Sequence, residues 1–316
     1  MTVSAQSSVR AQGDSVGSTL DKAARENFPV APGFLPAAWR GDLMAVYGFA
    51  RLVDDAGDGD LADPAGTARL LGAATPSEQP DDTVFRLGLL DAIERDLDRA
   101  FEAGLPGGAG EAPGHPLMRA LVPLVGKHAV TPEPFRRLIE ANRVDQTVAR
   151  YRTYEDLLGY CRLSADPVGR LVLALAGLAT PERIELSDRI CTALQIVEHL
   201  QDVAEDHASG RIYLPAEDMA RFRVTEEDLG RPTASPAVRE LVAFEAGRAR
   251  TLLDRGAPLV GTVRGRLRLL LAGFTAGGYA ALAAIEAAGH DVLAEQPKPD
   301  KRRLAMKAAA IFAKGR

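Results

Sequence analysis

The sequence predicts an all-α protein built as a single large helical bundle. Ala, Leu, Arg, Asp and Glu are frequent among the 316 residues, while runs of the β-branched residues Val, Ile and Thr are scarce; this mixture favours helices over strands. Apolar residues recur at helical spacing, and no stretch keeps the strict alternation of apolar and polar residues that a half-buried strand shows. No segment between the expected helices has the composition of an interdomain linker, so one helical domain is the simplest expectation.

The expected helices follow one another from residue 19 onwards, behind a polar arm (residues 1–18) that we expect to be disordered. They cover 19–27, 36–58, 83–103, 117–128, 133–148, 154–178, 181–207, 214–222, 236–256 and 259–288. A loop rich in Gly, Asp and Pro fills 59–82. Pro167 should kink or divide its helix, because proline has no amide hydrogen to donate. The helical domain is therefore expected to span 19–295, with a basic tail at 296–316.

Charge and cysteine content exclude several classes of protein. The formal net charge is −5, which provides no global positive field for nucleic acid. Cys161 and Cys191 cannot form a disulfide framework and fit buried free thiols, as expected in a reducing cytoplasm. The N-terminal arm lacks the apolar segment of a signal peptide, and no run of about 18 apolar residues predicts a membrane span.

A first acidic cluster closes the expected helix 36–58. Asp54 and Asp58 are four residues apart and share a helix face, where two unpaired carboxylates repel each other and weaken the helix. A divalent cation would remove that cost, and Mg²⁺ typically bridges a few carboxylates and a substrate phosphate. Taken alone, this cluster is more simply explained as a solvated acidic helix end. A calcium loop is disfavoured, because the residues after Asp60 lack the required ligand and glycine.

A second acidic stripe lies near the end of the expected helix 181–207. Its polar members are about one turn apart on an otherwise apolar helix: Gln195, Glu198, Asp202 and Asp206. Carboxylates buried without partners are costly. Acids in apolar surroundings are therefore typical of metal sites, water-filled cavities or ion pairs with arginine.

Two acidic stripes in one chain point to chemistry on a diphosphate. When an isoprenoid diphosphate ionises, the charge of the leaving group must be neutralised, and magnesium held between two acidic helices would do this. The resulting cation needs an apolar pocket that excludes stray water. Arg40, Arg51 and Arg211 lie beside the two clusters and are candidates to bind the diphosphate, although each taken alone fits a surface or ion-pair arginine better.

Several segments resemble one known family. Residues 47–58 resemble the first aspartate-rich motif of squalene and phytoene synthases, and 201–206 followed by 210–215 resemble the second. Residues 160–169 resemble the central Tyr-Cys segment of that family, and 244–289 resemble its closing helices. The chain is thus identified as a member of the squalene/phytoene synthase family, with the hydroxysqualene synthase branch of hopanoid pathways the most similar.

The resemblance implies an isoprenoid synthase bundle with a central apolar cavity, and a reaction. Presqualene diphosphate would lose diphosphate with the help of more than one Mg²⁺, and water would capture the rearranged cation to give hydroxysqualene, with no NADPH expected. The candidate magnesium ligands are Asp54, Asp55, Asp58, Glu198, Asp202 and Asp206; the candidate substrate-binding residues are Arg40, Arg51, Gln195, Arg211 and Tyr213; and the candidate catalytic residues are Tyr160, Tyr279, Arg51 and Arg211.

Alternatives remain open at four points. Condensing members of the family usually carry Asn where Glu198 stands, so Glu198 either binds magnesium or pairs with an arginine. Tyr160 and Tyr279 could be ordinary core rings. A condensing enzyme that joins two prenyl diphosphates would need the same acidic motifs. A non-catalytic scaffold relative would be expected to lose some aspartates, and all four outer positions remain Asp.

The basic tail, 296–316, combines Lys and Arg with apolar residues. Such a segment can touch the anionic surface of a membrane, which suits an enzyme with a lipid substrate and product. A frayed, solvated C-terminus is the slightly favoured alternative. The expected location is the cytoplasm, with peripheral contact at the inner membrane face.

Overall fold

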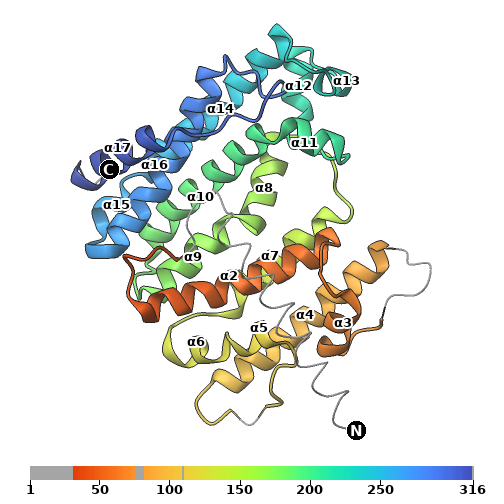
Figure 1. Cartoon of the computed structure of the whole chain (residues 1–316), viewed down its shortest axis with the longest axis vertical. Helices are drawn as coiled ribbons and strands as arrows, with labels where there is room; N and C mark the ends of the chain where they lie inside the picture. The colour runs from red at the N-terminus through yellow and green to blue at the C-terminus, as the bar shows by residue number, and fades with distance from the viewer. Residues whose placement is uncertain (1–30, 76–81, 109, 315–316) are drawn as a thin grey trace. The chain divides into compact units, whose positions relative to one another are not determined.

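The computed structural model describes residues 31–75, 82–108 and 110–314, and within these ranges its regular elements are all helices (Figure 1). One isolated β-bridge pairs Arg150 with Ile212. The helices are α2 (Ala37–Asp58), α3 (Pro64–Leu71), α4 (Asp82–Gly104), α5 (Pro116–Arg119), α6 (Val122–Lys127), α7 (Pro132–Asp145), α8 (Tyr154–Ser164), α9 (Asp166–Leu175), α10 (Pro181–Gln201), α11 (Val203–Ala208), α12 (Ala216–Phe222), α13 (Glu226–Leu229), α14 (Pro236–Gly256), α15 (Leu259–Thr262), α16 (Gly265–Ala287) and α17 (Lys301–Lys314). The all-α prediction is confirmed.

The chain divides into two compact units, residues 1–147 and 148–316. The described part of unit 1 contains α2 to α7, and that of unit 2 contains α8 to α17. One continuous domain was expected from the sequence, since the junction at Thr147 carries no Gly, Pro or Ser run. The expected arm 1–18 and helix 19–27 lie outside the described residues.

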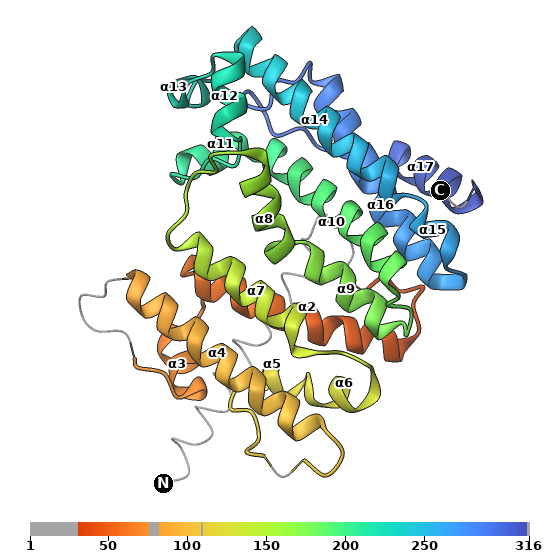
Figure 2. The same cartoon turned by 180° about the vertical axis from the view of Figure 1, so that it is seen from behind.

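In unit 1, α2 and α7 run side by side and pack with α4 (Figure 1, Figure 2). Phe49 of α2 and Phe101 of α4 both meet Phe135 of α7 edge to face, with ring centroids 5.0 and 5.7 Å apart. Such pairs contribute about 0.5–1.5 kcal/mol each beyond their burial. The buried carboxylate of Asp96 accepts the amide of His115 (2.9 Å) and so ties the start of α5 to α4. This packing fixes the helix that carries the first acidic motif.

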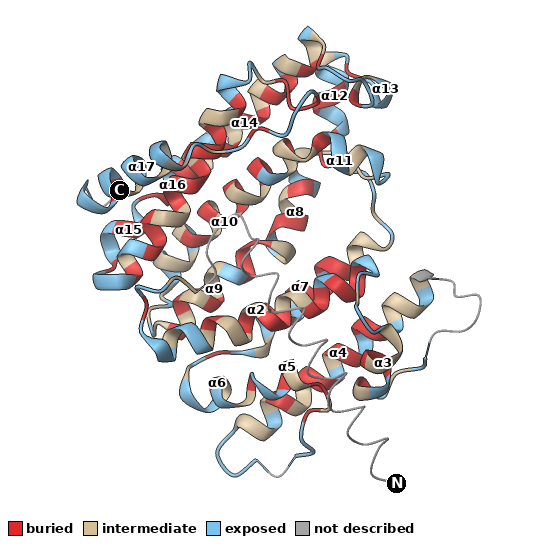
Figure 3. Ribbon diagram, viewed as in Figure 1, coloured by how far each residue is buried: buried red, intermediate tan, exposed pale blue. Residues whose placement is uncertain are grey.

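In unit 2, α10 packs against α9, α14 and α16, whose buried residues are marked in Figure 3. The helices approach closely at glycines. A Cβ added to Gly256 of α14 would lie 2.8 Å from the carbonyl oxygen of Leu186, and one added to Gly169 of α9 would lie 2.6 Å from Sγ of Cys191. Cys161 and Cys191 are both free thiols, as predicted. The close packing holds α10, which carries the second acidic stripe.

Several long helices predicted from the sequence are divided in the structure. Pro167 separates α8 from α9, as expected. It lies in the first turn of α9, where a backbone amide has no hydrogen-bond acceptor within the helix, so proline is tolerated there. The stretch 181–207 is also divided, at Asp202, whose φ of −104° and ψ of 10° lie outside the helical range. No proline or glycine marks that second break in the sequence. Helices α3 and α13 were not expected as separate elements.

The C-terminal tail forms helix α17, which packs against α15 and α16. Ile311 is buried in this contact, with 3% of its surface exposed. The favoured expectation of a frayed terminus is therefore wrong for Lys301–Lys314.

Among the described residues, helix α16 is the one helix to weigh against the expectation that no segment spans a membrane. By length and composition Gly265–Ala287 is apolar enough to cross a bilayer, but 61% of its most apolar stretch is buried inside the protein. Core helices of soluble proteins have the same properties, so this single helix is weak support for a span.

Candidate active site

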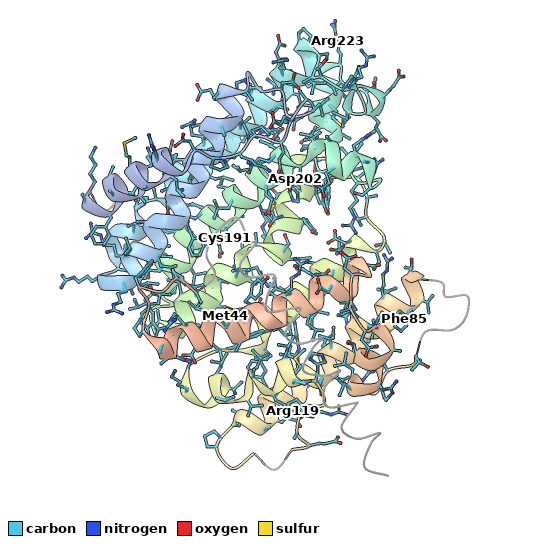
Figure 4. The ribbon with its side chains drawn as sticks, viewed as in Figure 1. Met44, Phe85, Arg119, Cys191, Asp202 and Arg223 are labelled. Carbon is cyan, nitrogen blue, oxygen red and sulfur yellow. The ribbon has the colours of Figure 1, made fainter. Side chains whose placement is uncertain are left out.

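The second acidic motif begins where α10 ends (Figure 4). The backbone bends at Asp202, yet the hydrogen bonds continue through the bend: the Asp202 amide donates to the Glu198 carbonyl (3.0 Å), and the Asp206 amide donates to the Asp202 carbonyl (2.8 Å). Asp202 and Asp206 therefore remain one turn apart, as the spacing predicted, although they belong to a bend and a short helix rather than to one continuous helix.

The carboxylates of this motif carry negative charge that the protein compensates poorly. Burial, reinforced by the charge of Asp202, raises the pKa of Asp206 to about 7, and Arg211 opposes this rise. Within the described part of the chain, the buried oxygen Oδ2 of Asp206 has no hydrogen-bond partner. Burial also raises the pKa of Asp202, and a hydrogen bond from Gln296 acts against it. An oxygen ligand buried in this way suits a cation.

A short loop places Arg211 and Tyr213 next to the motif. Gly210 adopts the left-handed conformation, with φ of 83°, and the Arg211 amide donates to the Asp206 carbonyl (2.8 Å). Arg150 then fastens the loop by donating to the carbonyl of Gly210 (2.6 Å). The loop therefore holds the Arg211 backbone on the last turn of the acidic motif.

Three tyrosines and one histidine form an aromatic cluster beside this loop. The ring of His199 stacks on Tyr213, with centroids 3.7 Å apart, and Tyr160 lies 5.7 Å from Tyr213 and 6.1 Å from His199. Tyr151 completes the cluster at 5.5 Å from Tyr160 and 5.6 Å from Tyr213. Nε2 of Gln195 lies 3.3 Å from Nε2 of His199. The structure thus brings the predicted residues Tyr160, Gln195 and Tyr213 together through His199.

Burial lowers the pKa of His199 to about 3, so its ring is neutral at physiological pH. Neither His199 nor Tyr151 was predicted from the sequence as a site residue. No local pattern distinguishes Tyr151, because its partners are contributed by α8 and by the loop at 210–215. Glu198, in contrast, is exposed on α10.

In unit 1, the first acidic motif divides into one buried and two exposed carboxylates. Asp55, 3% exposed, pairs with Arg51, whose Nε lies 2.9 Å from Oδ1 of Asp55. Asp54 and Asp58 reach solvent. The protein atoms packed around Asp54 nevertheless displace bulk water, and this desolvation raises the pKa of Asp54 to about 6. The hydrogen bond from Asn142 and the charge of Arg51 oppose the rise. Asp54 and Asp58 are thus the accessible carboxylates of this motif.

Two side chains of α7, which the sequence analysis missed, support the end of α2. Nδ2 of Asn142 donates to Oδ1 of Asp54 (3.3 Å), and Nε2 of Gln146 donates to the carbonyl oxygen of Gly57 (2.9 Å). The two helices approach so closely that a Cβ on Gly57 would lie 2.2 Å from Oδ1 of Asn142. The only sequence signal for this support was a pair of amides four residues apart on the expected helix 133–148.

Two other predicted residues, Arg40 and Tyr279, belong to α2 and α16. Arg40 is exposed in the first turn of α2, about 21 Å along the helix axis from Asp54 at 1.5 Å per residue. The hydroxyl of Tyr279 donates to Oδ1 of Asp254 (2.6 Å), and Nζ of Lys307 lies 4.3 Å from the centre of the Tyr279 ring. Their roles remain predictions.

The carboxylates of the acidic motifs fit magnesium only if water or substrate supplies further ligands. Among the described residues, no three His, Cys, Asp or Glu side chains are grouped to hold a metal ion by themselves. Mg²⁺ usually keeps several waters and takes one or two carboxylates together with substrate phosphates. Within unit 2, Asp206 with its unpartnered buried oxygen is a ligand of this kind; within unit 1, the accessible Asp54 and Asp58 are.

Comparisons with known proteins agree with the motifs. The hydroxysqualene synthase of Rhodopseudomonas palustris is 32% identical over 240 residues, covering 76% of this chain and 72% of that protein. The phytoene synthase of Arthrospira platensis is 31% identical over 247 residues, covering 73% and 71%. The crystal structure of squalene synthase HpnC from Alicyclobacillus acidocaldarius, 39% identical, matches with a TM-score of 0.71 and covers 89% of this chain and 96% of that one.

The family model for squalene/phytoene synthases matches residues 21–304, which include both acidic motifs and the aromatic cluster. The chain therefore belongs to the squalene/phytoene synthase family.

Proposed function

We propose that this protein converts presqualene diphosphate and water to hydroxysqualene and diphosphate, with magnesium as cofactor. The observation that carries the proposal is the arrangement in unit 2, where the poorly compensated carboxylates of Asp202 and Asp206 adjoin the cluster of Tyr160, His199 and Tyr213. The acids suit a cationic metal with a departing diphosphate, and the aromatic rings suit the carbocation that is left. The similarity to a protein named hydroxysqualene synthase supports this reaction.

The residues of the two acidic motifs would hold the cofactor and the leaving group. Asp54, Asp58, Asp202 and Asp206 would bind magnesium, which supplies Lewis-acid stabilisation of the diphosphate as the C–O bond breaks. Arg211, held beside Asp206 by its backbone bond, would orient the diphosphate. Arg51 and Gln195 would also orient the diphosphate. Arg51 would do so while its Nε remains paired with the Asp55 carboxylate.

The aromatic cluster would act on the cation. The faces of Tyr160 and Tyr213 are negative in potential and stabilise a nearby positive charge. Neutral His199 adds no positive charge that would repel the cation. Water would then attack the rearranged cation and lose one proton to give the alcohol.

A second candidate reaction is condensation of two prenyl diphosphates, as in phytoene synthases. The phytoene synthase of Arthrospira platensis supports this second candidate, because its sequence identity to this chain, 31%, is nearly the 32% of the hydroxysqualene synthase of Rhodopseudomonas palustris. Both reactions begin with ionisation of a diphosphate, so the acidic motifs serve either.

Product analysis by mass spectrometry separates the two reactions. The purified protein would receive Mg²⁺ and either presqualene diphosphate or farnesyl diphosphate, without nicotinamide. Hydroxysqualene from the first substrate, with the second unchanged, is the expected result. Consumption of farnesyl diphosphate would instead assign the condensing reaction, and no turnover of either would contradict both. Asp202→Asn is the matched inactive variant.

Peripheral contact with an anionic membrane is a further part of the proposal. Helix α17 contains five Lys or Arg residues and no acid, and Met306 and Phe312 are exposed on it. Flotation with phosphatidylglycerol vesicles should weaken in Arg302→Gln/Lys314→Gln but not in the exposed unit 1 control Arg69→Gln/Arg95→Gln. Equal flotation of all three proteins would exclude a role for α17.

A further inference from the structure

Residues 288–300 connect α16 to α17 without forming a helix; we call them the strap. The start of the strap is anchored by Asp291. Its Oδ1 accepts the amide of Ala234 (2.9 Å), and its Oδ2 accepts Nη2 of Arg239 (2.6 Å). Burial would raise the pKa of Asp291, but backbone amide donors and Arg239 hold it below its usual range. The carboxylate is therefore ionised and bonded, and the strap starts from a fixed point on α14.

The middle of the strap makes two reciprocal amide contacts with the second acidic motif. Nε2 of Gln296 donates to Oδ1 of Asp202, and Nε2 of Gln201 donates to the carbonyl oxygen of Pro297. Two consecutive residues of the strap, Gln296 and Pro297, are thus hydrogen-bonded to two consecutive residues of the motif, Asp202 and Gln201. Pro297 is itself buried.

The end of the strap is fixed by α17. Ile311 is buried against the preceding helices, and Nη2 of Arg268 on α16 donates to the carbonyl oxygen of Phe312. With anchors at both ends, the strap cannot move away from Asp202 without breaking packing elsewhere.

We propose that the strap is a structural part of the second magnesium-binding motif, and that Gln296 is a positioning residue that sets the orientation of the Asp202 carboxylate. The inference rests on the proposed function. Asp202 stands at a break between two helices, where the backbone alone constrains it less than a continuous helix would. A carboxylate has about four lone-pair sites, so one amide bond at Oδ1 orients the group and leaves Oδ2 for a metal.

The proposal changes the expected boundary of the functional domain. From the sequence, the helical domain was expected to end at residue 295, with 296–316 as a basic tail. Residues 296 and 297 are instead in direct contact with the acidic motif, so a truncation at 295 would remove part of the site.

Titration calorimetry of the full-length protein with Mg²⁺ in the presence of inorganic diphosphate tests the inference without turnover. Groups that orient a metal ligand typically contribute 10- to 100-fold to metal affinity, so Gln296→Ala should weaken Mg²⁺ binding by about tenfold. Its exposed neighbour provides the control, Glu295→Gln, which should bind as the wild type does. Thermal unfolding without metal, measured in parallel, verifies that each variant is folded.

A double-mutant cycle tests whether the two amide bonds act through one strap. Because Gln201→Ala and Gln296→Ala release the same segment, the double variant should lose less affinity than the product of the two single losses. Independent, fully multiplying losses would contradict the strap as a unit.

The outcomes separate this inference from the proposed function. If Gln296→Ala binds Mg²⁺ as tightly as the wild type, or more tightly, while Asp202→Asn loses binding, the positioning role is overturned and the proposed function stands. If the wild type binds Mg²⁺ no better than Asp202→Asn, both fail.

Discussion

The imidazole ring of His199 lies flat on the phenol ring of Tyr213, with the ring centroids 3.7 Å apart and the planes within 10° of parallel. His199 comes from the last turns of α10, and Tyr213 comes from the loop after α11. The stack therefore connects the helix that carries the acidic stripe to the loop that carries Arg211. It fixes the position of a ring that the proposed function uses to stabilise a cation.

Replacement of His199 should separate the stacking from the polar contact. His199→Ala removes both the ring and the contact with Gln195, and we expect turnover to fall by up to about tenfold, since an aromatic pair contributes roughly 0.5–1.5 kcal/mol. His199→Phe retains a ring and should recover most of the loss. Steady-state kinetics of both variants measure the difference. If His199→Phe is as impaired as His199→Ala, the contact with Gln195 matters and the stack does not.

Gly57 should tolerate no side chain, because its Cβ position lies 2.2 Å from Oδ1 of Asn142. Gly57→Ala must displace the side chain of Asn142, and we expect a loss of about 1–3 kcal/mol in the free energy of unfolding. Asn142 would also move away from Asp54. Urea unfolding measures the loss.

Gly41 gives a matched control on the same helix. A Cβ at this exposed position meets no atom within 4 Å, so Gly41→Ala should stabilise the protein by up to about 1 kcal/mol through helix propensity. Equal effects of the two substitutions would show that the contact of Gly57 with Asn142 does not limit the packing.

Asp206 should limit the stability of the metal-free protein. Asp206→Asn removes a carboxylate whose buried oxygen lacks a partner in the described part of the chain, so the melting temperature without metal should stay the same or rise. Mg²⁺ with diphosphate at about 100 times its Kd should stabilise the wild type by about 2.7 kcal/mol and leave Asp206→Asn unchanged. Glu205→Gln, at an exposed neighbouring position, should keep the metal response. A full response in Asp206→Asn would exclude Asp206 as a ligand.

Local sequence pattern was sufficient for most helices and for the spacing of the acids. Pro167 marked the boundary between α8 and α9 correctly, because the physical effect of proline on a helix is local. The break at Asp202 has no such signal. Its bend accompanies contacts with Gln296 and Pro297, which are more than 90 residues away in the chain. Contacts of that separation leave no periodic trace in a single sequence.

The candidate site shows the same division. The acids at i and i+4 and the loop at 210–215 were predictable from spacing and from family resemblance. Asn142 and Tyr151 were not, because each acts on a residue of another element: Asn142 of α7 on Asp54, and Tyr151 on Tyr160 and Tyr213. Asp55 was predicted as a ligand because it belongs to the segment that resembles the first aspartate-rich motif of the family, but its burial against Arg51 depends on how α2 packs.

A buried acid on α14 should make the stability of the protein depend on pH. Glu245 is 1% exposed, and Nη1 of Arg248 donates both to its Oε1 (3.0 Å) and to Oδ2 of Asp218 (2.6 Å). Burial raises the pKa of Glu245 to about 8, Arg248 opposes the rise, and Asp218 adds to it. The folded protein therefore keeps this proton up to about pH 8, whereas the unfolded chain releases it near pH 4.5.

Because the unfolded state binds fewer protons over this window, stability is full below about pH 4.5 and falls as pH rises through 8. Glu245→Gln mimics the protonated acid and does not titrate, so its melting temperature should fall less than that of the wild type between pH 5 and pH 8.5. Glu240→Gln, at an exposed position on α14, should retain the fall seen in the wild type. Thermal unfolding across this pH range measures all three proteins, and parallel curves for the wild type and Glu245→Gln would show that Glu245 does not hold a proton in the folded state.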